Sequence, residues 1–209
     1  MEIIPGILEK DWGEIERKIE TVRPFAKSIH IDIIDGKFAP NTTFLDPAPF
    51  SKYAKDLFLE LHMMVENPIQ YLEPWASAGF RRFIGHIEKM PDQVEFIAQG
   101  QLLGEVGLAI DGPTDPSMIK VPYEDLDCVL LMAIKAGQSG QVLNPEYLKK
   151  AEILRSAQND IIIEVDGGIS DKTISLAKSS KANRFVSTSF IFIGQNPQER
   201  YNLLKDKII

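Results

Sequence analysis

The sequence has a single cysteine and no concentrated positive charge. Among 209 residues only Cys128 carries a thiol, which excludes an internal disulfide. The net charge is −7 and no basic run occurs, so nucleic acid and anionic membranes are poor partners. The sequence also lacks the basic and apolar segments of a signal peptide, and no apolar run is long enough to span a membrane. We therefore expect a soluble, cytoplasmic protein whose partner is a small molecule.

An internal linker and low-complexity segments are also absent. Eight apolar stretches predict strands, and a helix-compatible or short turn-rich segment follows each of them. The predicted strands cover residues 3–8, 28–34, 57–65, 82–87, 106–110, 128–134, 161–165 and 184–187. The predicted helices cover residues 11–22, 48–55, 69–77, 91–98, 116–119, 145–155, 170–179 and 197–204.

This order of elements predicts the fold class. Most of the strands are apolar on both faces, which is typical of parallel sheets. Eight β-then-α units in a chain of this length predict an α/β fold, a parallel eight-stranded (β/α)8 TIM barrel that forms one domain over residues 1–209. An open doubly wound sheet is the alternative, but no G-x-G-x-x-G motif follows the first strand.

Polar residues interrupt the ends of three apolar strands. His30 and Asp32 alternate with isoleucines and so share one strand face, while His62 and Asp166 end the third and seventh strands. In a (β/α)8 barrel these strand ends meet at the mouth that holds the active site. Because an unpaired buried polar group costs about 2 kcal/mol or more, we expect the four side chains to converge.

Two imidazoles and two carboxylates suit a divalent Zn, Fe, Mn or Co ion, whereas nitrogen ligands disfavour Mg and Ca. The alternative is a hydrogen-bonded His–Asp cluster without metal.

Four segments carry a family resemblance. Residues 30–41, HIDIIDGKFAPN, resemble the H-x-D-x-M-D-G-x-F-x-P-N signature of the ribulose-phosphate 3-epimerases. Residues 61–65, 140–141 and 164–169, which read LHMMV, GQ and EVDGGI, are similar to later segments of that family. The resemblance extends from the first strand to the last helix.

The resemblance implies an isomerase of the pentose phosphate pathway, an epimerase of carbohydrate metabolism. The expected enzyme binds one divalent metal and interconverts D-ribulose 5-phosphate and D-xylulose 5-phosphate. The implied metal ligands are His30, Asp32, His62 and Asp166. Asp32 would take the C3 proton and Asp166 would return one on the opposite face, because inversion through an enediolate needs an acid/base on each side. The family also implies a homo-oligomer.

The substitutions relative to the family lie at the sugar and phosphate positions. Gly6 stands where the family usually has serine, the loop 135–141 reads KAGQSGQ instead of N/E-P-G-F-G-G-Q, and Thr188 replaces a glycine. The implied substrate-binding residues are Gly6, His62, Gly137, Gln138, Ser139, Gly140, Gly167, Gly168, Thr188 and Ser189. We therefore predict metal-assisted epimerisation with altered affinity or substrate choice.

Two alternative functions remain at this point. One is a related 3-epimerase that acts on a hexulose such as allulose 6-phosphate, which differs from the first candidate in pocket length. The other is a barrel that binds a sugar phosphate or a metal without turnover. The weakened phosphate loop favours such a binder, whereas the presence of both Asp32 and Asp166 favours an enzyme.

Overall fold

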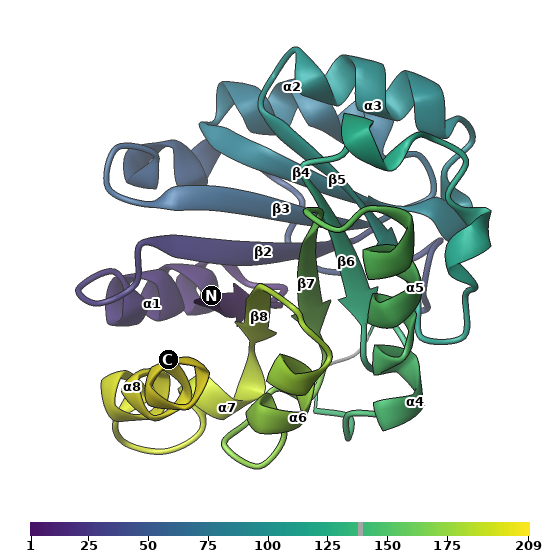
Figure 1. Ribbon diagram of the computed structural model, residues 1–209. Coiled ribbons are helices and arrows are strands. Elements are labelled where there is room, and N and C mark those ends of the chain that lie inside the picture. Colours follow the sequence, from purple (N-terminus) through teal and green to yellow (C-terminus); the bar gives the residue numbers. More distant parts are fainter. Residues whose placement is uncertain (138–139) are drawn as a thin grey trace.

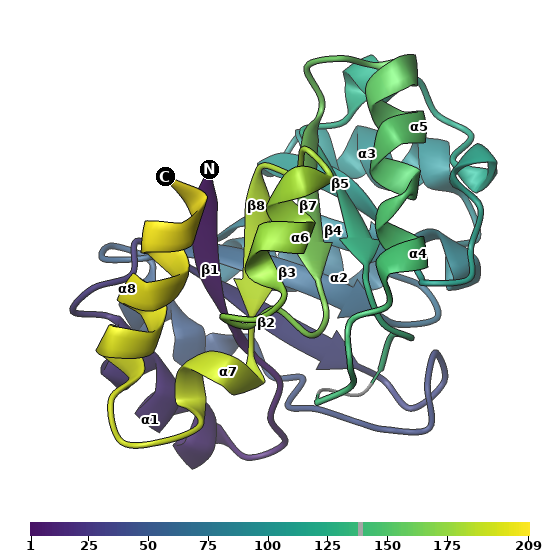
Figure 2. The same ribbon diagram turned by 60° about the horizontal axis from the view of Figure 1, so that its bottom comes forward.

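Eight parallel strands pair in sequence order and close into a barrel, because β1 pairs with both β2 and β8 (Figures 1 and 2). This computed structural model describes residues 1–137 and 140–209. The strands are β1 (Glu2–Ile7), β2 (Ser28–Ile34), β3 (Phe58–Met64), β4 (Phe80–His86), β5 (Glu105–Ile110), β6 (Cys128–Met132), β7 (Ile162–Asp166) and β8 (Arg184–Ser187). The predicted (β/α)8 barrel is confirmed.

Helices cover the outside of the barrel, and both termini lie side by side where α8 packs on β1 (Figure 2). They are α1 (Trp12–Val22), α2 (Ile69–Ser77), α3 (Gln93–Gln101), α4 (Pro145–Leu148), α5 (Lys150–Ala157), α6 (Ile174–Ser179), α7 (Ser189–Phe192) and α8 (Pro197–Ile208). Four short 3-10 helices lie in the connections: η1 (Ala48–Tyr53), η2 (Ile87–Lys89), η3 (Pro116–Met118) and η4 (Tyr123–Asp125).

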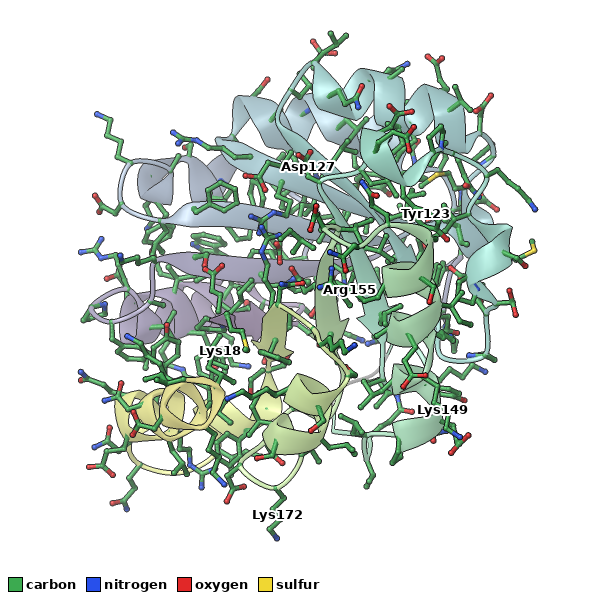
Figure 3. All side chains as sticks on the ribbon, viewed as in Figure 1. Lys18, Tyr123, Asp127, Lys149, Arg155 and Lys172 are labelled. Atoms are coloured by element: carbon green, nitrogen blue, oxygen red, sulfur yellow. The ribbon has the colours of Figure 1, made fainter. Side chains whose placement is uncertain are left out.

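The helix α1 illustrates how sequence determines these elements. Asp11 caps it by accepting a hydrogen bond from the Glu14 backbone N–H, and Ile15, Ile19 and Val22 are buried at helical spacing. Elsewhere on the surface, the charged side chains of Lys149, which follows α4, and Lys172, which precedes α6, point away from the barrel (Figure 3). The helices thus bury an apolar face against the barrel and leave charged side chains in contact with solvent.

Several predicted helices differ from the structure. The helices expected at 48–55 and 116–119 are the 3-10 helices η1 and η3, and α8 extends to Ile208, beyond the predicted end at residue 204. The helix expected at 91–98 begins at Gln93 and extends through Gly100 to Gln101. A Cβ at Gly100 would lie 2.6 Å from Val106 Cγ2, so glycine at this position allows close packing. The helix expected at 145–155 is divided into α4 and α5. The helix expected at 170–179 begins only at Ile174, and α7 was not predicted.

The barrel interior has an apolar side and a charged side. A small cluster of buried residues fills the apolar side and includes Ile84, Ala109, Leu130 and Met132. Cys128 belongs to this cluster, and burial raises the pKa of its thiol, so it serves as a packing residue. The charged side holds buried polar residues, among them His30, Glu60, Arg82 and Glu164, and it supports the site described next.

Candidate active site

The four predicted metal-ligating residues come together at the mouth of the barrel. The register of β2 on β3 pairs Asp32 with His62. His62 Nδ1 lies 2.7 Å from Asp32 Oδ1 and 3.9 Å from Asp166 Oδ2, and His30 Nε2 lies 3.3 Å from the same Asp32 oxygen. One possible ligand atom from each residue lies within 4.8 Å of the others. All four side chains are buried, and Asp166 is the most exposed at 7%.

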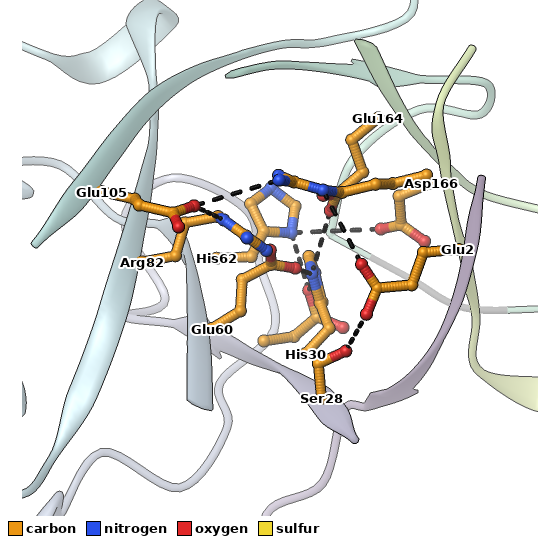
Figure 4. A network of polar contacts seen from close by, with 11 residues as sticks. Glu2, Ser28, His30, Glu60, His62, Arg82, Glu105, Glu164 and Asp166 are labelled. Carbon is orange, nitrogen blue, oxygen red and sulfur yellow. Dashed lines mark hydrogen bonds and ion pairs between the residues drawn. The ribbon is translucent and has the colours of Figure 1, made fainter. Parts of the chain in front are cut away.

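A chain of polar groups, of which Glu60 and Arg82 are buried, orients the His30 ring from the side away from the mouth (Figure 4). Its Nδ1 lies 2.5 Å from Glu60 Oε1, and the other Glu60 oxygen accepts a hydrogen bond from Arg82. Arg82 Nε in turn donates to Glu105 Oε2 at 2.7 Å. Because Nδ1 contacts Glu60, the ring turns Nε2 toward Asp32. Within residues 1–137 and 140–209 this Nε2 makes no hydrogen bond; the Asp32 oxygen at 3.3 Å is an ion-pair contact only.

A cavity that opens to solvent lies at the two aspartates. Both Asp32 and Asp166 line it. So do six of the residues predicted to bind substrate: Gly137, Gly140, Gly167, Gly168, Thr188 and Ser189. Of the remaining four, Gly6 lies behind Thr188 and His62 is fully buried beside Asp32, while Gln138 and Ser139 lie outside the described residues.

All four glycines that line the cavity have a positive φ angle, which is +102° at Gly137 and +82° at Gly140. Gly167 and Gly168 have φ angles of +108° and +70°, which residues with a side chain rarely adopt. A Cβ at Gly168 would also lie 2.6 Å from the backbone nitrogen of Leu143. The turn after β7 therefore keeps its backbone open toward the cavity.

Comparison with known proteins assigns the chain to a family. The model of the ribulose-phosphate 3-epimerase family matches residues 2–192. The chain belongs to the ribulose-phosphate 3-epimerase family. The ribulose-phosphate 3-epimerase of Schizosaccharomyces pombe is 32% identical over 214 residues, which is 99% of this chain and 93% of that protein. The cytoplasmic isoform of Oryza sativa subsp. japonica is 35% identical over 215 residues, again 99% and 93% of the two chains.

Solved structures of other sugar-phosphate enzymes share the fold of this ribulose-phosphate 3-epimerase family member. The 3-hexulose-6-phosphate synthase of Salmonella typhimurium has a TM-score of 0.72 at 13% identity and covers 100% of this chain and 98% of that chain. KGPDC from Streptococcus mutans, solved in complex with D-R5P, has a TM-score of 0.76 at 11% identity and covers 99% and 96%. Among the described residues no helix is long and apolar enough to cross a membrane.

In this epimerase-family site the two aspartates have opposite pKa shifts. Burial acts to raise the pKa of Asp32, but His30 and His62 outweigh it and lower the value to about 2. Burial and the negative charge of Asp32 raise the pKa of Asp166 to about 7. The fold therefore provides one carboxylate that stays ionised and one carboxyl group that holds a proton near neutral pH.

The two histidines also differ. Burial lowers the pKa of His62 to about 4, so its ring is neutral, which is the form that ligates metals. For His30, burial acts to lower the pKa, but Asp32, Glu164 and Glu60 outweigh it and raise the pKa well above its ordinary value. A cation at this cluster would compete with the His30 proton.

Sequence reasoning missed three buried residues in this epimerase-family site: Glu60, Arg82 and Glu164. Glu60 is two residues before His62 and Glu164 is two before Asp166, so strand alternation could have placed both on the inner face. Glu164 Oε1 lies 3.4 Å from His30 Nδ1, and within the described ranges neither Glu164 oxygen has a hydrogen-bond partner. No local pattern shows that Arg82 meets Glu60, because that contact depends on the strand register.

Proposed function

We propose that this protein is a ribulose-phosphate 3-epimerase that inverts C3 of D-ribulose 5-phosphate to give D-xylulose 5-phosphate, and the reverse. The observation that carries this proposal is the pair of aspartates that line one cavity from β2 and β7. Strands β1 and β8 separate β2 from β7 around the barrel, so the two carboxyl groups enter the cavity from different sides. Inversion at one carbon needs an acid and a base placed in this way.

The residues divide the proton transfers between them. The C3 hydrogen is acidic because C3 neighbours the C2 ketone, and its removal gives an enediolate. In the forward direction Asp32 removes this proton from one face of C3. Asp166 then delivers a proton to the opposite face, and the roles reverse for xylulose 5-phosphate. The opposite pKa shifts of the two groups match a starting state with Asp32 ionised and Asp166 protonated.

We infer that the cluster holds one divalent Zn, Fe, Mn or Co ion. His30 supports this inference, because its buried Nε2 has no hydrogen-bond partner among the described residues and Glu60 holds the opposite ring nitrogen. The ligands would be His30, Asp32, His62 and Asp166, a two-nitrogen, two-oxygen set suited to these metals. When bound, such an ion supplies Lewis-acid stabilisation of the negative charge that develops on the substrate.

The glycine-rich end of the cavity is the proposed phosphate site. Backbone N–H groups in turns with positive φ form concave anion sites, and Gly167 and Gly168 have such angles. The roles of Gln138 and Ser139 at this site remain predictions, as do a homo-oligomer and a single functional domain over residues 1–209.

A hydrogen-exchange experiment tests this proposal. Wild-type protein loaded with metal should turn over D-ribulose 5-phosphate in a coupled assay. Asp166→Asn and Asp32→Asn should each lose epimerisation, yet in D2O each should exchange the C3 hydrogen of only one epimer, and the two variants should exchange opposite epimers. Asp206→Asn, an exposed position on α8, is the matched control and should keep wild-type activity.

Three results would contradict the proposal. If either variant exchanged the C3 hydrogen of both epimers, the two-base mechanism would be ruled out. Turnover of allulose 6-phosphate but not of the pentulose phosphates would change the substrate. No turnover of any ketose phosphate by the metal-loaded wild type would leave a non-catalytic binder. Elemental analysis of the purified protein reports the metal separately.

A further inference from the structure

Thr188 carries a hydroxyl group that the fold does not use. It is the residue between β8 and α7, at the N-cap position of α7. A threonine at this position usually accepts a hydrogen bond from the first turn of the helix, but the Thr188 side chain makes no such bond. Nor does any other hydrogen bond to this hydroxyl occur in the part of the chain that the structure describes. Thr188 lines the cavity with Asp32 and Asp166.

Gly6 is the neighbour that leaves room for this hydroxyl. The register of β1 on β8 pairs Pro5 with Ser187, which sets Gly6 beside Thr188. A Cβ at Gly6 would overlap Thr188 Oγ1 and lie 2.8 Å from Val186 Cγ1. The φ angle of Gly6 is not in the left-handed region, so its backbone does not require glycine. Glycine is required at this position because the Thr188 side chain occupies the space that a Cβ of residue 6 would need.

The position of Thr188 along the barrel axis indicates what it contacts. Val186 pairs with Asp166 across β8 and β7, so Thr188 lies two residues farther out, level with the Gly167–Gly168 turn. A phosphate beside the Asp32–Asp166 pair would be repelled by the negative charge of Asp32, whereas the outer level offers glycine backbone and hydroxyl groups. A hydroxyl donor there fits a phosphate oxygen.

We propose that the Thr188 hydroxyl donates a hydrogen bond to the phosphate group of the substrate, and that Gly6 and Thr188 form one coupled specificity-determining unit. This inference rests on the proposed function, because it assumes that the cavity takes a phosphorylated ketose. The proposed contact differs from the backbone contacts of the glycine turn. Here a side chain that follows β8 adds a hydrogen-bond donor to the site, and Gly6 on β1 leaves the space for it.

A set of substitutions tests the hydroxyl. Thr188→Val keeps the branched shape and removes the donor, so KM for D-ribulose 5-phosphate should rise about tenfold while kcat changes less than twofold. The inhibition constant for inorganic phosphate should rise by a similar factor. Thr188→Ser keeps a hydroxyl and should stay within about threefold of wild type. A general structural disturbance would instead lower kcat and affect both Thr188 variants.

A double-mutant cycle tests the coupling. Gly6→Ala should raise KM about tenfold in the wild-type background, since the new Cβ displaces the Thr188 hydroxyl. In Thr188→Gly, which has already lost the hydroxyl, adding Gly6→Ala should change KM less than twofold. Equal effects of Gly6→Ala in both backgrounds would overturn the coupling, and wild-type KM and phosphate inhibition in Thr188→Val would overturn the phosphate contact.

Phosphate binding separates this inference from the proposed function. Titration calorimetry of the metal-loaded protein with inorganic phosphate needs no turnover. A wild type that binds phosphate about tenfold more tightly than Thr188→Val, but turns over no ketose phosphate, supports the contact and ends the proposed function. A wild type that binds no phosphate overturns the contact, whatever its activity.

Discussion

Replacing Arg82 by methionine should strongly destabilise the protein, because it removes one of the two cationic groups, Arg82 and His30, that contact the buried Glu60 carboxylate. Arg82 is 4% exposed and donates hydrogen bonds to both Glu60 and Glu105. Glu60 is fully buried between Arg82 and His30. Methionine retains most of the length of the side chain and its apolar stem but removes the charge and all its donors. The variant therefore tests the electrostatic contribution more than the packing contribution.

The size of this effect follows from the burial of the pair. Removing one partner of a buried ion pair typically costs about 3–5 kcal/mol, whereas the total free energy of unfolding of a domain is about 5–15 kcal/mol. Urea denaturation at pH 7 should therefore show a midpoint lower by about 1–2 M. The adjacent Arg81 is exposed, so Arg81→Met is a matched control that should change the free energy of unfolding by less than about 0.5 kcal/mol.

The pH dependence of this difference gives a second test. Burial acts to raise the pKa of Glu60, but His30 and Arg82 outweigh it and hold the pKa well below its ordinary value of 4.5. A carboxyl group with a lowered pKa contributes stability above its unfolded-state pKa and loses it as the pH falls below that value. The difference between wild type and Arg82→Met should therefore be largest at pH 6–8 and shrink below about pH 4.5.

A double variant makes the reasoning refutable. Glu60→Gln removes the carboxylate, so Glu60→Gln/Arg82→Met should be at least about 1 kcal/mol more stable than the sum of the two single effects predicts. Two results would refute the argument: equal stability of Arg82→Met and Arg81→Met at pH 7, or strict additivity in the double variant.

Three further predictions follow from the same structure. Glu60→Gln should weaken the affinity for Zn²⁺ about 10–100-fold in a chelator-competition titration, whereas the exposed Glu124→Gln should not change it. Trp75→Ala should lower the free energy of unfolding by about 3–5 kcal/mol, because Trp75 is fully buried against Phe50 and Phe80; thermal denaturation measures this. Asp166→Asn should stabilise the chelator-treated protein at pH 8 by up to about 4 kcal/mol and by less than half of that at pH 5. Burial raises the pKa of Asp166 to about 7, so the free energy of unfolding lost by keeping Asp166 buried grows as the pH rises from about 4 to 7. Melting curves of both proteins at the two pH values measure this difference in stability.

The strands could be predicted from the sequence because each is buried on both faces. Most of the strands are therefore largely apolar, and the eight predicted strands all occur, with every end within two residues of the prediction. Helix ends were less predictable, since tertiary contacts decide them. The helix α6, for example, begins after Thr173 and not at residue 170. The Thr173 hydroxyl makes no capping hydrogen bond to the helix and instead donates to the Gly168 carbonyl, a partner that no local pattern reveals.

The four clustered side chains at the mouth could be predicted for a different reason. In a parallel barrel all carboxyl ends of strands meet, so polar residues at those ends must converge. The support beneath them could not be predicted, because it depends on pairing between strands. A register shift between Leu59 and Glu60 on β3 sets Glu60 opposite Arg82 on β4, and only this alignment connects the two charges.

The orientation of the His30 ring accounts for much of the charged interior of this barrel. If His30 is to present Nε2 to the mouth, its Nδ1 proton needs an acceptor, and Glu60 provides one at a fully buried position. A buried carboxylate then needs a cation, which is Arg82, and a buried guanidinium needs a second acceptor, which is Glu105. The Glu105 side chain is 41% exposed, so water can solvate its charge and no further buried partner is needed. Each buried charge in this series thus requires the next one, and the series ends at Glu105 because solvent reaches that side chain. An apolar interior could replace Glu60 and Arg82 without loss only if His30 were absent as well.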